Sequence, residues 1–477
     1  MLVYKFGGAT TRSVRGLENL VAICSRTFGE ELAAASRRRR TSKQLPGLAV
    51  VVSAIGHTTR RLRSIAEDAE DGRALFAGGT LERLLERHAQ LARSLELSPR
   101  IYDRTISQFE KITKDVASRV EGVMITRELS PRTLDSFLAR GEQFSSTLIA
   151  ALLEDRGLPV VLVDARKFII TNSDFGNAIP DTAEIRKKVS EQLLPHLEEG
   201  KLILTQGFIG GTLTGETTTM GSESSDLTAT LLGQALDASE IVIWKTVPGI
   251  YTADPELVKT AKPIRHLSFE EADEMGRRGV RALFPKVAQP LIQQGSTATI
   301  RVTAPALKTL RGTTVSATTG IIRSPKPIAL ALEQNITTLY IRPPKEGSYR
   351  NGVKSTSSLL MAADTIPSFA FKRAYYYWAS DTEITLCFRR DEKRTLIRAL
   401  KEKGYEVAEE KPLAALSLLV RTRDAAQDLS NIRERILRAL RRFPVRAVFP
   451  VESSFVILLD EHRSEDALRK LHREFFE

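Results

Sequence analysis

The feature that most constrains the fold is residues 48–54, a nearly unbroken run of small and branched apolar side chains. Pro46-Gly47 precedes the run and Gly56 follows it. Such a run is typical of a strand that is buried on both faces, and sheets of this kind are mostly parallel because crossover helices cover each side. Residues 2–6, which end at Gly7-Gly8, form a second short apolar run. The sequence therefore predicts a parallel sheet.

Strand patterns and helix patterns alternate through the first 300 residues. A helix is expected over about residues 12–27, and another over residues 131–155, which ends at Gly157-Leu158-Pro159. The further strand candidates are Val160–Val163, Leu202–Gln206, Glu240–Trp244 and Thr299–Val302. This order predicts an αβα sandwich around a mostly parallel sheet, and we expect that domain to occupy residues 1–304.

The remainder of the chain shows a different pattern of expected strands and helices. Residues 305–327 are rich in proline, glycine and threonine and lack periodic hydrophobicity, so we interpret them as a linker. Residues 328–477 alternate short strand and helix patterns in small units. Two small, interleaved α/β modules account for this region better than one large sheet does.

Charge narrows the classes of partner without selecting one. The formal net charge is +12, which favours an anionic substrate, an anionic surface or nucleic acid. The densest basic run, Arg37–Arg40 followed by Lys43, has no nucleic-acid motif or interleaved aromatic surface beside it. We interpret it as a solvated insertion and expect no nucleic acid as partner.

Cysteine use and hydropathy exclude other classes. Cys24 and Cys387 are far apart in sequence, so neither a disulfide framework nor a thiolate zinc site is expected. The histidines are dispersed, which argues against a transition-metal centre. No apolar run approaches the ~18 residues that a membrane span needs. The opening residues have no signal-peptide pattern, and we expect a cytoplasmic protein.

Glycine-rich turns after two expected strands suggest a phosphate site. Lys5-Phe6-Gly7-Gly8 places a cation at a strand end, followed by residues that let backbone N–H groups approach an anion. A plain tight turn is the alternative for this motif alone. Residues 206–211 repeat the pattern, and the hydroxyl-rich segment 217–226 then leads into a helix. Within that segment Asp226 suits Mg²⁺ or phosphoryl orientation, although Ser225 or Asp226 as an ordinary helix N-cap is equally expected.

Two further features suggest a place for an amino-acid substrate. Glu142 follows Gly141 inside an otherwise apolar helix, where a buried carboxylate would bind an ammonium group. A solvated glutamate on the outer face of the helix is the commoner alternative. Ser53, with Thr58 and Thr59, adds hydroxyl groups at the end of a strand, where open α/β sheets usually bind ligands.

These motifs together resemble those of the aspartate kinases, in the amino-acid kinase superfamily, whose C-terminal part consists of two interlocked, ferredoxin-like ACT domains. The resemblance covers the first 300 residues in the family's order, and one segment in the linker and one at the end of the chain also match. The matching segments are 5–8, 51–54, 141–142, 207–210, 217–221, 225–229, 251–255, 267–272, 312–313 and 467–476.

The resemblance implies ATP-dependent phosphorylation of the β-carboxylate of L-aspartate to 4-phospho-L-aspartate, at the start of lysine, threonine and methionine synthesis. It implies Lys5 and Asp226 as catalytic residues: Lys5 neutralises the transferred phosphoryl group and Asp226 organises Mg²⁺-ATP, directly or through water. The attacking carboxylate is already ionised and needs no general base. The other implied residues are Gly7, Gly8, Gly210, Ser225, Thr246, Tyr251 and Arg281 for the nucleotide and Ser53, Thr59, Glu142 and Ser222 for the substrate.

The sequence departs from the family pattern within the expected site. Ser222 replaces an arginine that is expected to pair with a substrate carboxylate, which removes a bidentate contact, and Glu223 adds a negative charge beside it. The usual Trp-Thr-Asp-Val-Asp-Gly motif appears as Trp-Lys-Thr-Val-Pro-Gly at residues 244–249, and Arg281 replaces a lysine. Lys245 and Arg281 are the candidates to substitute for the missing arginine.

The C-terminal region is expected to mediate assembly. The Gly-Met-rich effector loops of the family are not evident, although residues 351–353 resemble a remnant. The aromatic run 375–378 suits an effector or subunit contact, with core and edge packing as the commoner alternative. Small sheets of this kind pair through their edges, so we expect a homodimer.

Two other functions stay open at the level of sequence. The first is a kinase of the same fold that phosphorylates another amino acid or small carboxylate, because Ser222 removes the usual arginine. The second is a non-catalytic regulatory subunit that binds amino acids through its C-terminal modules. Lys5 and Asp226 argue against the second.

Overall fold

The chain forms two compact units, which consist of Met1–Ile250, Pro263–Arg277 and Arg281–Gly320 in the first and Tyr251–Lys262, Arg278–Val280 and Ile321–Glu477 in the second. The boundaries expected from sequence, at 304 and 328, do not anticipate the two short early segments of the second unit. The computed structural model describes residues 1–37, 47–221, 224–280, 287–305, 312–317, 325–342, 376–379, 384–389, 397–398, 400–401, 405–409, 412–422, 429–452 and 454–477. The predictions for Arg38–Arg40 and Lys43, for Ser222 and Glu223, for Arg281 and for residues 351–353 lie outside these residues.

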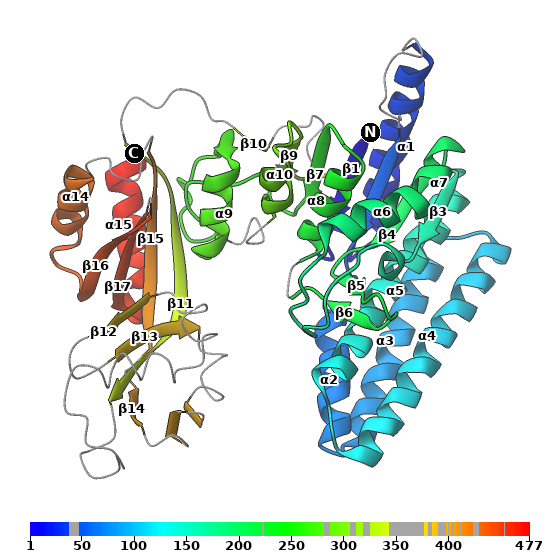
Figure 1. The fold of residues 1–477 in the computed structure, drawn as a ribbon, viewed down its shortest axis with the longest axis horizontal. Helices are drawn as coiled ribbons and strands as arrows, with labels where there is room; N and C mark the ends of the chain where they lie inside the picture. The colour runs from blue at the N-terminus through cyan, green and yellow to red at the C-terminus, as the bar shows by residue number, and fades with distance from the viewer. Residues whose placement is uncertain are drawn as a thin grey trace. The chain divides into compact units, whose positions relative to one another are not determined.

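The first unit is built on an eight-stranded sheet in the order β3-β4-β2-β1-β7-β9-β10-β8 (Figure 1). Among the described residues, the pairings from β3 to β9 and the pairing of β10 with β8 are parallel, whereas the β9–β10 pairing is antiparallel. This confirms the predicted α/β fold with a mostly parallel sheet. The strands are β1 (Leu2–Phe6), β2 (Leu48–Val52), β3 (Val160–Val163), β4 (Leu202–Gln206), β7 (Glu240–Trp244), β8 (His266–Ser268), β9 (Thr299–Thr303) and β10 (Thr313–Ser316), with a separate hairpin of β5 (Ile209–Gly211) and β6 (Thr217–Thr219).

Helices cover both faces of this sheet. In β1, Tyr4 hydrogen-bonds Thr27 of α1, whereas the next residue, Lys5, pairs with Asp226 of α8. Because successive side chains of a strand point to opposite faces, α1 and α8 lie on opposite sides. The helices are α1 (Val14–Arg37), α2 (Thr58–Glu70), α3 (Ala74–Ser94), α4 (Pro99–Thr126), α5 (Pro131–Asp155), α6 (Thr182–Gln192), α7 (Leu194–Glu198), α8 (Ser225–Ala235), α9 (Phe269–Arg277) and α10 (Gln289–Gln294), with the 3-10 turn η1 (Ala165–Lys167).

The segment interpreted as a linker contributes to the sheet. Residues 313–316 form β10, in which Thr313 and Val315 are buried while Thr314 and Ser316 are partly exposed. This alternation is typical of a half-buried strand, but threonine and serine at three of its four positions conceal it in a search for apolar runs. The loop interpretation is therefore wrong for these four residues.

The second unit contains a seven-stranded sheet in the order β12-β13-β11-β15-β17-β16, in which β14 also pairs with β11. All its pairings are antiparallel. Its elements are β11 (Lys326–Arg342), β12 (Tyr376–Ala379), β13 (Ile384–Arg389), β14 (Glu406–Glu409), β15 (Leu413–Arg421), β16 (Val445–Val451), β17 (Ser454–Asp460), α14 (Ser430–Leu440) and α15 (Ser464–Phe476), with the 3-10 turn η3 (Glu461–Arg463).

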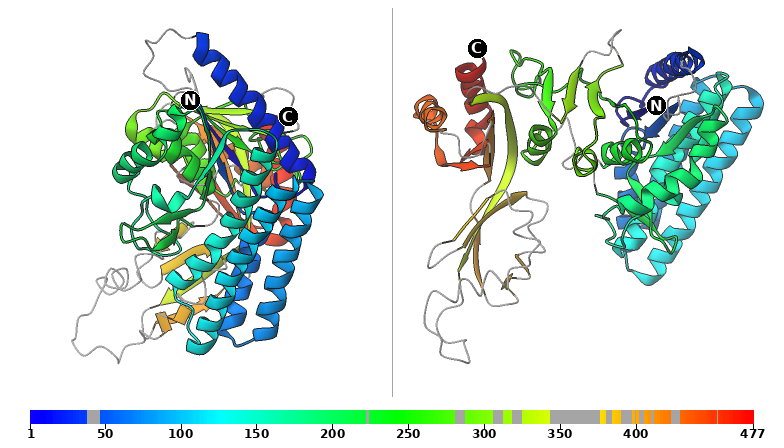
Figure 2. Two further views of the ribbon diagram at one scale, coloured as in Figure 1. Left: turned by 90° about the vertical axis from the view of Figure 1, so that its right-hand side faces the viewer. Right: turned by 45° about the horizontal axis from the view of Figure 1, so that its top comes forward.

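One long strand belongs to two modules of this unit. The first half of β11 pairs with β15, and its second half pairs with β13 and β14 (Figure 2). The register shifts between Glu333 and Ile336, where Asn335 has a φ of 59°. A bulge at a residue that tolerates the left-handed region lets one strand change partners. The predicted pair of interleaved α/β modules is confirmed.

Residues 251–262 pack within the second unit. The Leu330 backbone N–H donates to the Thr252 carbonyl at 2.7 Å, and the Thr252 hydroxyl hydrogen-bonds His472 Nε2 of α15 at 2.9 Å. Ala253 and Val258 are buried in the same apolar core as Leu471. These contacts explain why the segment belongs to the second unit although first-unit strands flank it in sequence. Among the described helices, none is both long and apolar enough to cross a membrane.

Candidate active site

The glycine and hydroxyl motifs converge at one edge of the first sheet. Phe6 is level with Val52 and with Trp244, and Val52 is level with Gln206. Because these strands are parallel neighbours, their carboxyl ends lie side by side. The segments that follow them are Gly7-Gly8 after β1, Ser53-Ala54 after β2, Gly207-Phe208 after β4 and Lys245-Thr246 after β7. The structure thus brings together four segments that are remote in sequence.

Asp226 lies between two lysines at this edge. Its Oδ1 is 2.7 Å from Lys5 Nζ and its Oδ2 is 2.7 Å from Lys245 Nζ. The carboxylate is 1% exposed, and the side chains of Lys5 and Lys245 are 6% and 20% exposed. Burial by itself raises the pKa of Asp226, but the charges and hydrogen bonds of Lys245 and Lys5 outweigh it and lower that pKa below its usual value. Asp226 is therefore an anion at neutral pH.

The turn after β1 approaches the neighbouring strand end closely. A Cβ at Gly8 would lie 2.0 Å from the Ala54 carbonyl oxygen, and one at Gly7 would lie 3.5 Å from Lys5 Nζ. The Gly56 N–H donates to the Gly8 carbonyl at 3.0 Å, which ties the turn to the loop after β2. The tight turn considered as an alternative is also present, because the Thr10 N–H donates to the Gly7 carbonyl. Only glycine fits at position 8.

We expect Gly8→Ala to destabilise the protein by roughly 1–3 kcal/mol, the usual effect of overpacking, because the new methyl group collides with backbone rather than with a flexible side chain. Gly29→Ala is the matched control. Gly29 lies in α1, and a Cβ there would meet nothing within 4 Å, so this change should stabilise by about 0.5–1 kcal/mol. Urea unfolding of both variants measures the difference, and equal stabilities would contradict the packing account.

The start of α8 packs against the end of β4. A Cβ at Gly207 would lie 2.5 Å from Ser225 Cβ, and the Phe208 N–H donates to Thr228 Oγ1 at 3.1 Å. Ser224 occupies the N-cap position of α8 without a side-chain cap hydrogen bond, so the N-cap alternative for Ser225 or Asp226 is wrong. Within the described part of the chain, buried Ser224 Oγ has no hydrogen-bond partner. An orphaned hydroxyl at a helix N-terminus suits an anionic ligand.

Glu142 is buried inside the unit rather than solvated on the outer face of α5. Its side chain is 3% exposed, and Oε1 accepts a hydrogen bond from the Ala54 N–H at 3.2 Å. Oε2 is buried and has no partner among the described residues. Burial raises the pKa of Glu142 to about 8, although the Ala54 N–H and the charge of Lys5 oppose the shift. The solvated alternative is therefore wrong, and the free oxygen is suited to a cation such as an ammonium group.

The other expected site residues differ in their exposure and in the unit to which they belong. Ser53 and Thr59 are partly exposed after β2, and Thr246 is exposed after β7. A Cβ at Gly210 would lie 2.7 Å from the Ile169 carbonyl oxygen, so close packing within the unit already requires glycine there. Tyr251 belongs to the second unit. The roles of these five residues remain predictions.

Asp135 is an anchoring residue that the sequence analysis missed. It is 1% exposed and accepts hydrogen bonds from the N–H and hydroxyl of Thr219 at 2.8 and 2.7 Å and from the Gly176 N–H at 2.8 Å. Thr219 ends β6, just before the segment that leads into α8. An acidic residue among apolar positions in the first turns of a helix is the signal that could have identified it.

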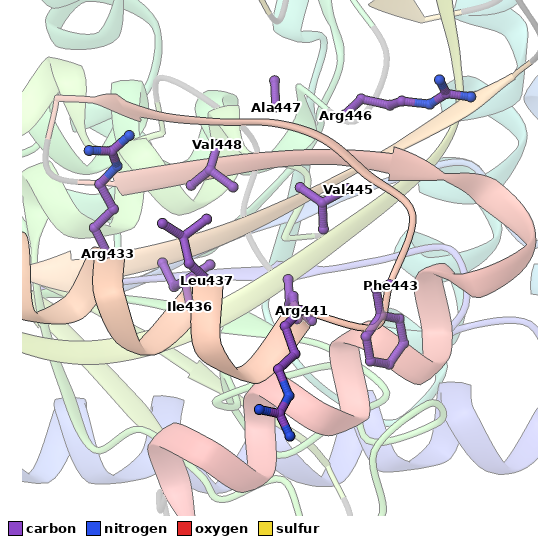
Figure 3. Close-up of a pocket in the computed structure, with 10 residues that line it drawn as sticks. Arg433, Ile436, Leu437, Arg441, Phe443, Val445, Arg446, Ala447 and Val448 are labelled. Atoms are coloured by element: carbon purple, nitrogen blue, oxygen red, sulfur yellow. The ribbon is translucent and has the colours of Figure 1, made fainter.

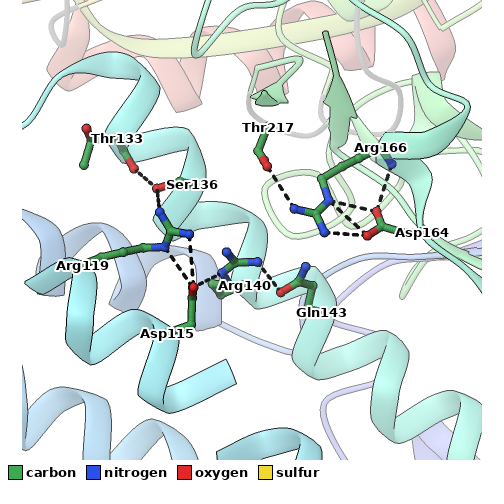
Figure 4. A network of polar contacts seen from close by, with 9 residues as sticks. All are labelled: Asp115, Arg119, Thr133, Ser136, Arg140, Gln143, Asp164, Arg166 and Thr217. Atoms are coloured by element: carbon green, nitrogen blue, oxygen red, sulfur yellow. Dashed lines mark hydrogen bonds and ion pairs between the residues drawn. The ribbon is translucent and has the colours of Figure 1, made fainter. Parts of the chain in front are cut away.

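Arginines near the first turns of α5 are already paired with carboxylates. Asp115 accepts hydrogen bonds from Arg119 and forms an ion pair with Arg140, and Asp164 accepts from Arg166, which also donates to Thr217 (Figure 4). Arg140 also donates to Gln143 at 2.7 Å. These ion pairs hold α4 against α5 and fix the β6 segment. We therefore assign them a structural role rather than that of the arginine missing at position 222.

A cavity of about 390 Å³ lies in the second unit, between α14 and β16 (Figure 3). Its lining combines apolar side chains of α14 and β16 with the side chains of Arg433, Arg441 and Arg446. None of the described residues expected at the active site lines this cavity.

The described residues contain no cluster of three or more His, Cys, Asp or Glu side chains that could hold a metal ion. Asp226 was the expected contact for Mg²⁺, but each of its oxygens lies at hydrogen-bond distance from an ammonium group. A carboxylate held in this way is a poor fit for direct Mg²⁺ ligation.

Comparison with known proteins finds relatives that are named aspartokinases, the family that the motifs resemble. The lysine-sensitive aspartokinase 3 of Escherichia coli is 37% identical over 245 residues, 51% of this chain and 52% of that protein. The aspartokinase of Chlamydia trachomatis is 30% identical over 294 residues, 61% of this chain and 59% of that protein. These matches span between half and three fifths of the relatives. Over the whole of both chains, the fold matches the structure of E. coli aspartokinase III in complex with aspartate and ADP, with a TM-score of 0.81 and 27% identity.

The resemblance drawn from the sequence motifs is thus confirmed. A search of protein families matches residues 1–302, nearly two thirds of the chain, to the amino acid kinase family. That region contains the parallel sheet, the glycine turns and the pair of lysines around Asp226. The chain belongs to the amino acid kinase family.

Proposed function

We propose that the protein is an aspartate kinase, which transfers the γ-phosphoryl group of ATP to the β-carboxylate of L-aspartate and so serves amino-acid biosynthesis. The observation that carries this proposal is the meeting of Lys5, Asp226 and the buried Glu142 at one edge of the sheet. Cationic groups there suit the phosphates, and a carboxyl group without a second partner suits the ammonium group of an amino acid. The relatives named as aspartokinases and the fold shared with aspartokinase III support the choice of aspartate.

The chemistry requires positioning and charge stabilisation rather than proton transfer. An oxygen of the β-carboxylate attacks the γ-phosphorus, the bond from that phosphorus to the β,γ-bridging oxygen breaks, and its electron pair leaves with ADP. The attacking group is already an anion at neutral pH, so no general base is needed. Lys5 lies beside the Gly7 turn, where its ammonium group would stabilise charge on the transferred phosphoryl group. Asp226 orients that ammonium group.

Glu142 would select an amino acid among carboxylates. Its Oε1 is fixed by the Ala54 N–H, which leaves Oε2 to accept from a substrate ammonium group. Ser53 and Thr59 stand at the same strand end and would donate hydroxyl hydrogen bonds to the substrate. We expect Mg²⁺ to accompany ATP as its phosphate complex, and we derive no step through a metal held by the protein.

The direct test is to trap the acyl phosphate. Purified protein with Mg²⁺-ATP, L-aspartate and hydroxylamine should yield aspartyl hydroxamate in step with ADP release. Product with another amino acid or small carboxylate, and none with aspartate, would change the acceptor but keep the kinase. No product with any acid, together with amino-acid binding in calorimetry, would instead identify a regulatory subunit.

The same proposal includes the cellular location and the oligomeric state of the enzyme. Both cysteines are free and buried, which suits the reducing cytoplasm. In the second unit, β12 and β16 are the outer strands of the sheet order, and edges of this kind pair readily with a second copy. We therefore expect a homodimer formed through this unit, and sedimentation equilibrium across protein concentrations tests it.

A further inference from the structure

Lys245 stands at a position where the usual motif of the family has threonine. It directly follows β7, and its backbone N–H donates to the Thr303 carbonyl at 2.8 Å, which fixes the chain at this point. Its ammonium group reaches Asp226 Oδ2 at 2.7 Å. Lys5 reaches the other oxygen of the same carboxylate from the neighbouring strand β1. The two lysines therefore project from adjacent strand ends onto one acidic side chain.

Two ammonium groups share the single carboxylate of Asp226. The Lys245 ammonium group has three N–H donors, and its hydrogen bond to Asp226 Oδ2 uses one of them. Lys245 is also more exposed than Lys5, at 20% against 6%, so an incoming ligand can reach it. The arrangement is thus prepared for a negatively charged partner.

The same geometry disfavours a divalent cation on Asp226. Mg²⁺ binds oxygen ligands at about 2.0–2.1 Å and prefers carboxylates that are free to coordinate. Here both carboxylate oxygens already lie 2.7 Å from ammonium groups, so a metal on either oxygen would have to displace one lysine or sit beside two positive charges. Asp226 is better suited to holding two cations in place for a phosphate.

We propose that Lys245 is a second phosphate-binding residue of the active site, positioned by Asp226, and that Asp226 organises the two lysines rather than a metal ion. This proposal rests on the proposed function in one respect, namely that the ligand is a nucleotide. It does not depend on which acid accepts the phosphoryl group. Lys245 contacts phosphate oxygens of the bound nucleotide, and Lys5 contacts the transferred phosphoryl group. Lys245 also does not replace the substrate-binding arginine missing at position 222, because its ammonium group is already held at Asp226.

The test compares nucleotide binding with and without metal. Calorimetry with ADP in the presence of EDTA isolates the contribution of the protein's own cations. Lys245→Met, which keeps the length of the side chain and leaves the Lys5–Asp226 pair intact, should weaken ADP binding in EDTA about tenfold or more, as expected for loss of a charged hydrogen bond. Lys245→Arg should restore much of the affinity. Lys201→Met, which removes a lysine paired with Glu199 on the surface, is the matched control and should bind like the wild type.

Steady-state kinetics and an Asp226 variant complete the test. Lys245→Met should raise KM for ATP and lower kcat while leaving KM for the acceptor nearly unchanged. In EDTA, Lys245→Met should cost less ADP affinity in an Asp226→Asn background than in the wild type if Asp226 positions Lys245, whereas an effect of Asp226→Asn that appears only in the presence of Mg²⁺ would identify Asp226 as a metal ligand and overturn the proposal. Wild-type ADP binding by a folded Lys245→Met protein, judged by an unchanged Tm, would also overturn it.

These outcomes separate the two proposals. If hydroxamate forms with aspartate but Lys245→Met binds ADP normally, the role of Lys245 fails and the proposed function stands. If no hydroxamate forms with aspartate but ADP binding still depends on Lys245, the proposed acceptor fails and the phosphate-binding role stands.

Discussion

Lys5→Met should lower kcat by about 100- to 1,000-fold, the usual effect of removing a group that stabilises charge in the transition state. Lys5 is more deeply buried than Lys245, and Asp226 holds its ammonium group at 2.7 Å beside the Gly7 turn. The variant should still fold, because Lys245 continues to pair with Asp226. A coupled assay of ADP release at saturating substrates measures the loss.

Two controls show whether a loss of turnover comes from the candidate site rather than from misfolding. Lys201→Met should keep wild-type turnover, since Lys201 pairs with Glu199 on the surface, away from the strand ends described above. The Tm of Lys5→Met should stay within a few degrees of the wild type. Near-normal turnover in a folded Lys5→Met protein would remove the phosphate site from this edge of the sheet.

Glu142→Gln should weaken aspartate binding by roughly 2 kcal/mol or more, which corresponds to about 30-fold or more in KM. The amide keeps the shape of the side chain but removes the charge that would pair with the substrate ammonium group. KM for ATP should change less, because the hydrogen bond that Glu142 makes is to the Ala54 N–H and not to either lysine around Asp226. Steady-state kinetics with each substrate varied in turn measures the difference, and Glu154→Gln, an exposed position near the end of α5, is the control. An unchanged KM for aspartate would contradict the assignment.

The same residue should make stability depend on pH. Burial raises the pKa of Glu142 from 4.5 to about 8, so the folded protein without substrate holds a proton that the unfolded chain releases. The contribution of Glu142 to folding is therefore fully present below pH 4.5 and declines as the pH rises to about 8. Glu142→Gln removes this decline, so its stability relative to the wild type should increase over that range, by on the order of a few kcal/mol in total. Unfolding curves at several pH values would refute the account if both proteins changed in parallel.

Substrate binding offers an independent check on that pKa. An ammonium group at Oε2 favours the ionised form of Glu142, so aspartate binding near pH 7 should release close to one proton. Calorimetry in two buffers with different ionisation enthalpies measures the release. It should be absent for Glu142→Gln if aspartate still binds detectably, and it should fade above about pH 8 in the wild type. Equal heats in both buffers at pH 7 would show that Glu142 does not lose a proton when the substrate binds, which contradicts this account.

Local sequence patterns accounted for the parallel sheet and for much of the site. The branched run at 48–54 and the short run before Gly7-Gly8 became the neighbouring strands β2 and β1, because burial on both faces requires apolar residues in unbroken order. A search for apolar runs does not identify polar strands such as β10, in which threonine and serine occupy three of the four positions. Glu142 illustrates a limit of a different kind, since a glutamate in a helix has two common environments that the sequence does not distinguish.

The sequence by itself determined which chemical groups stand at strand ends, because a glycine after an apolar run marks a turn wherever the strand lies in the sheet. Only the tertiary structure decided which of those ends are neighbours and which charges meet. Lys5 and Lys245 are 240 positions apart, yet parallel pairing of β1 with β7 brings both onto Asp226. The burial that raises the pKa of Glu142 likewise comes from packing around α5. Register and packing are long-range properties, and they determine how these charged groups interact.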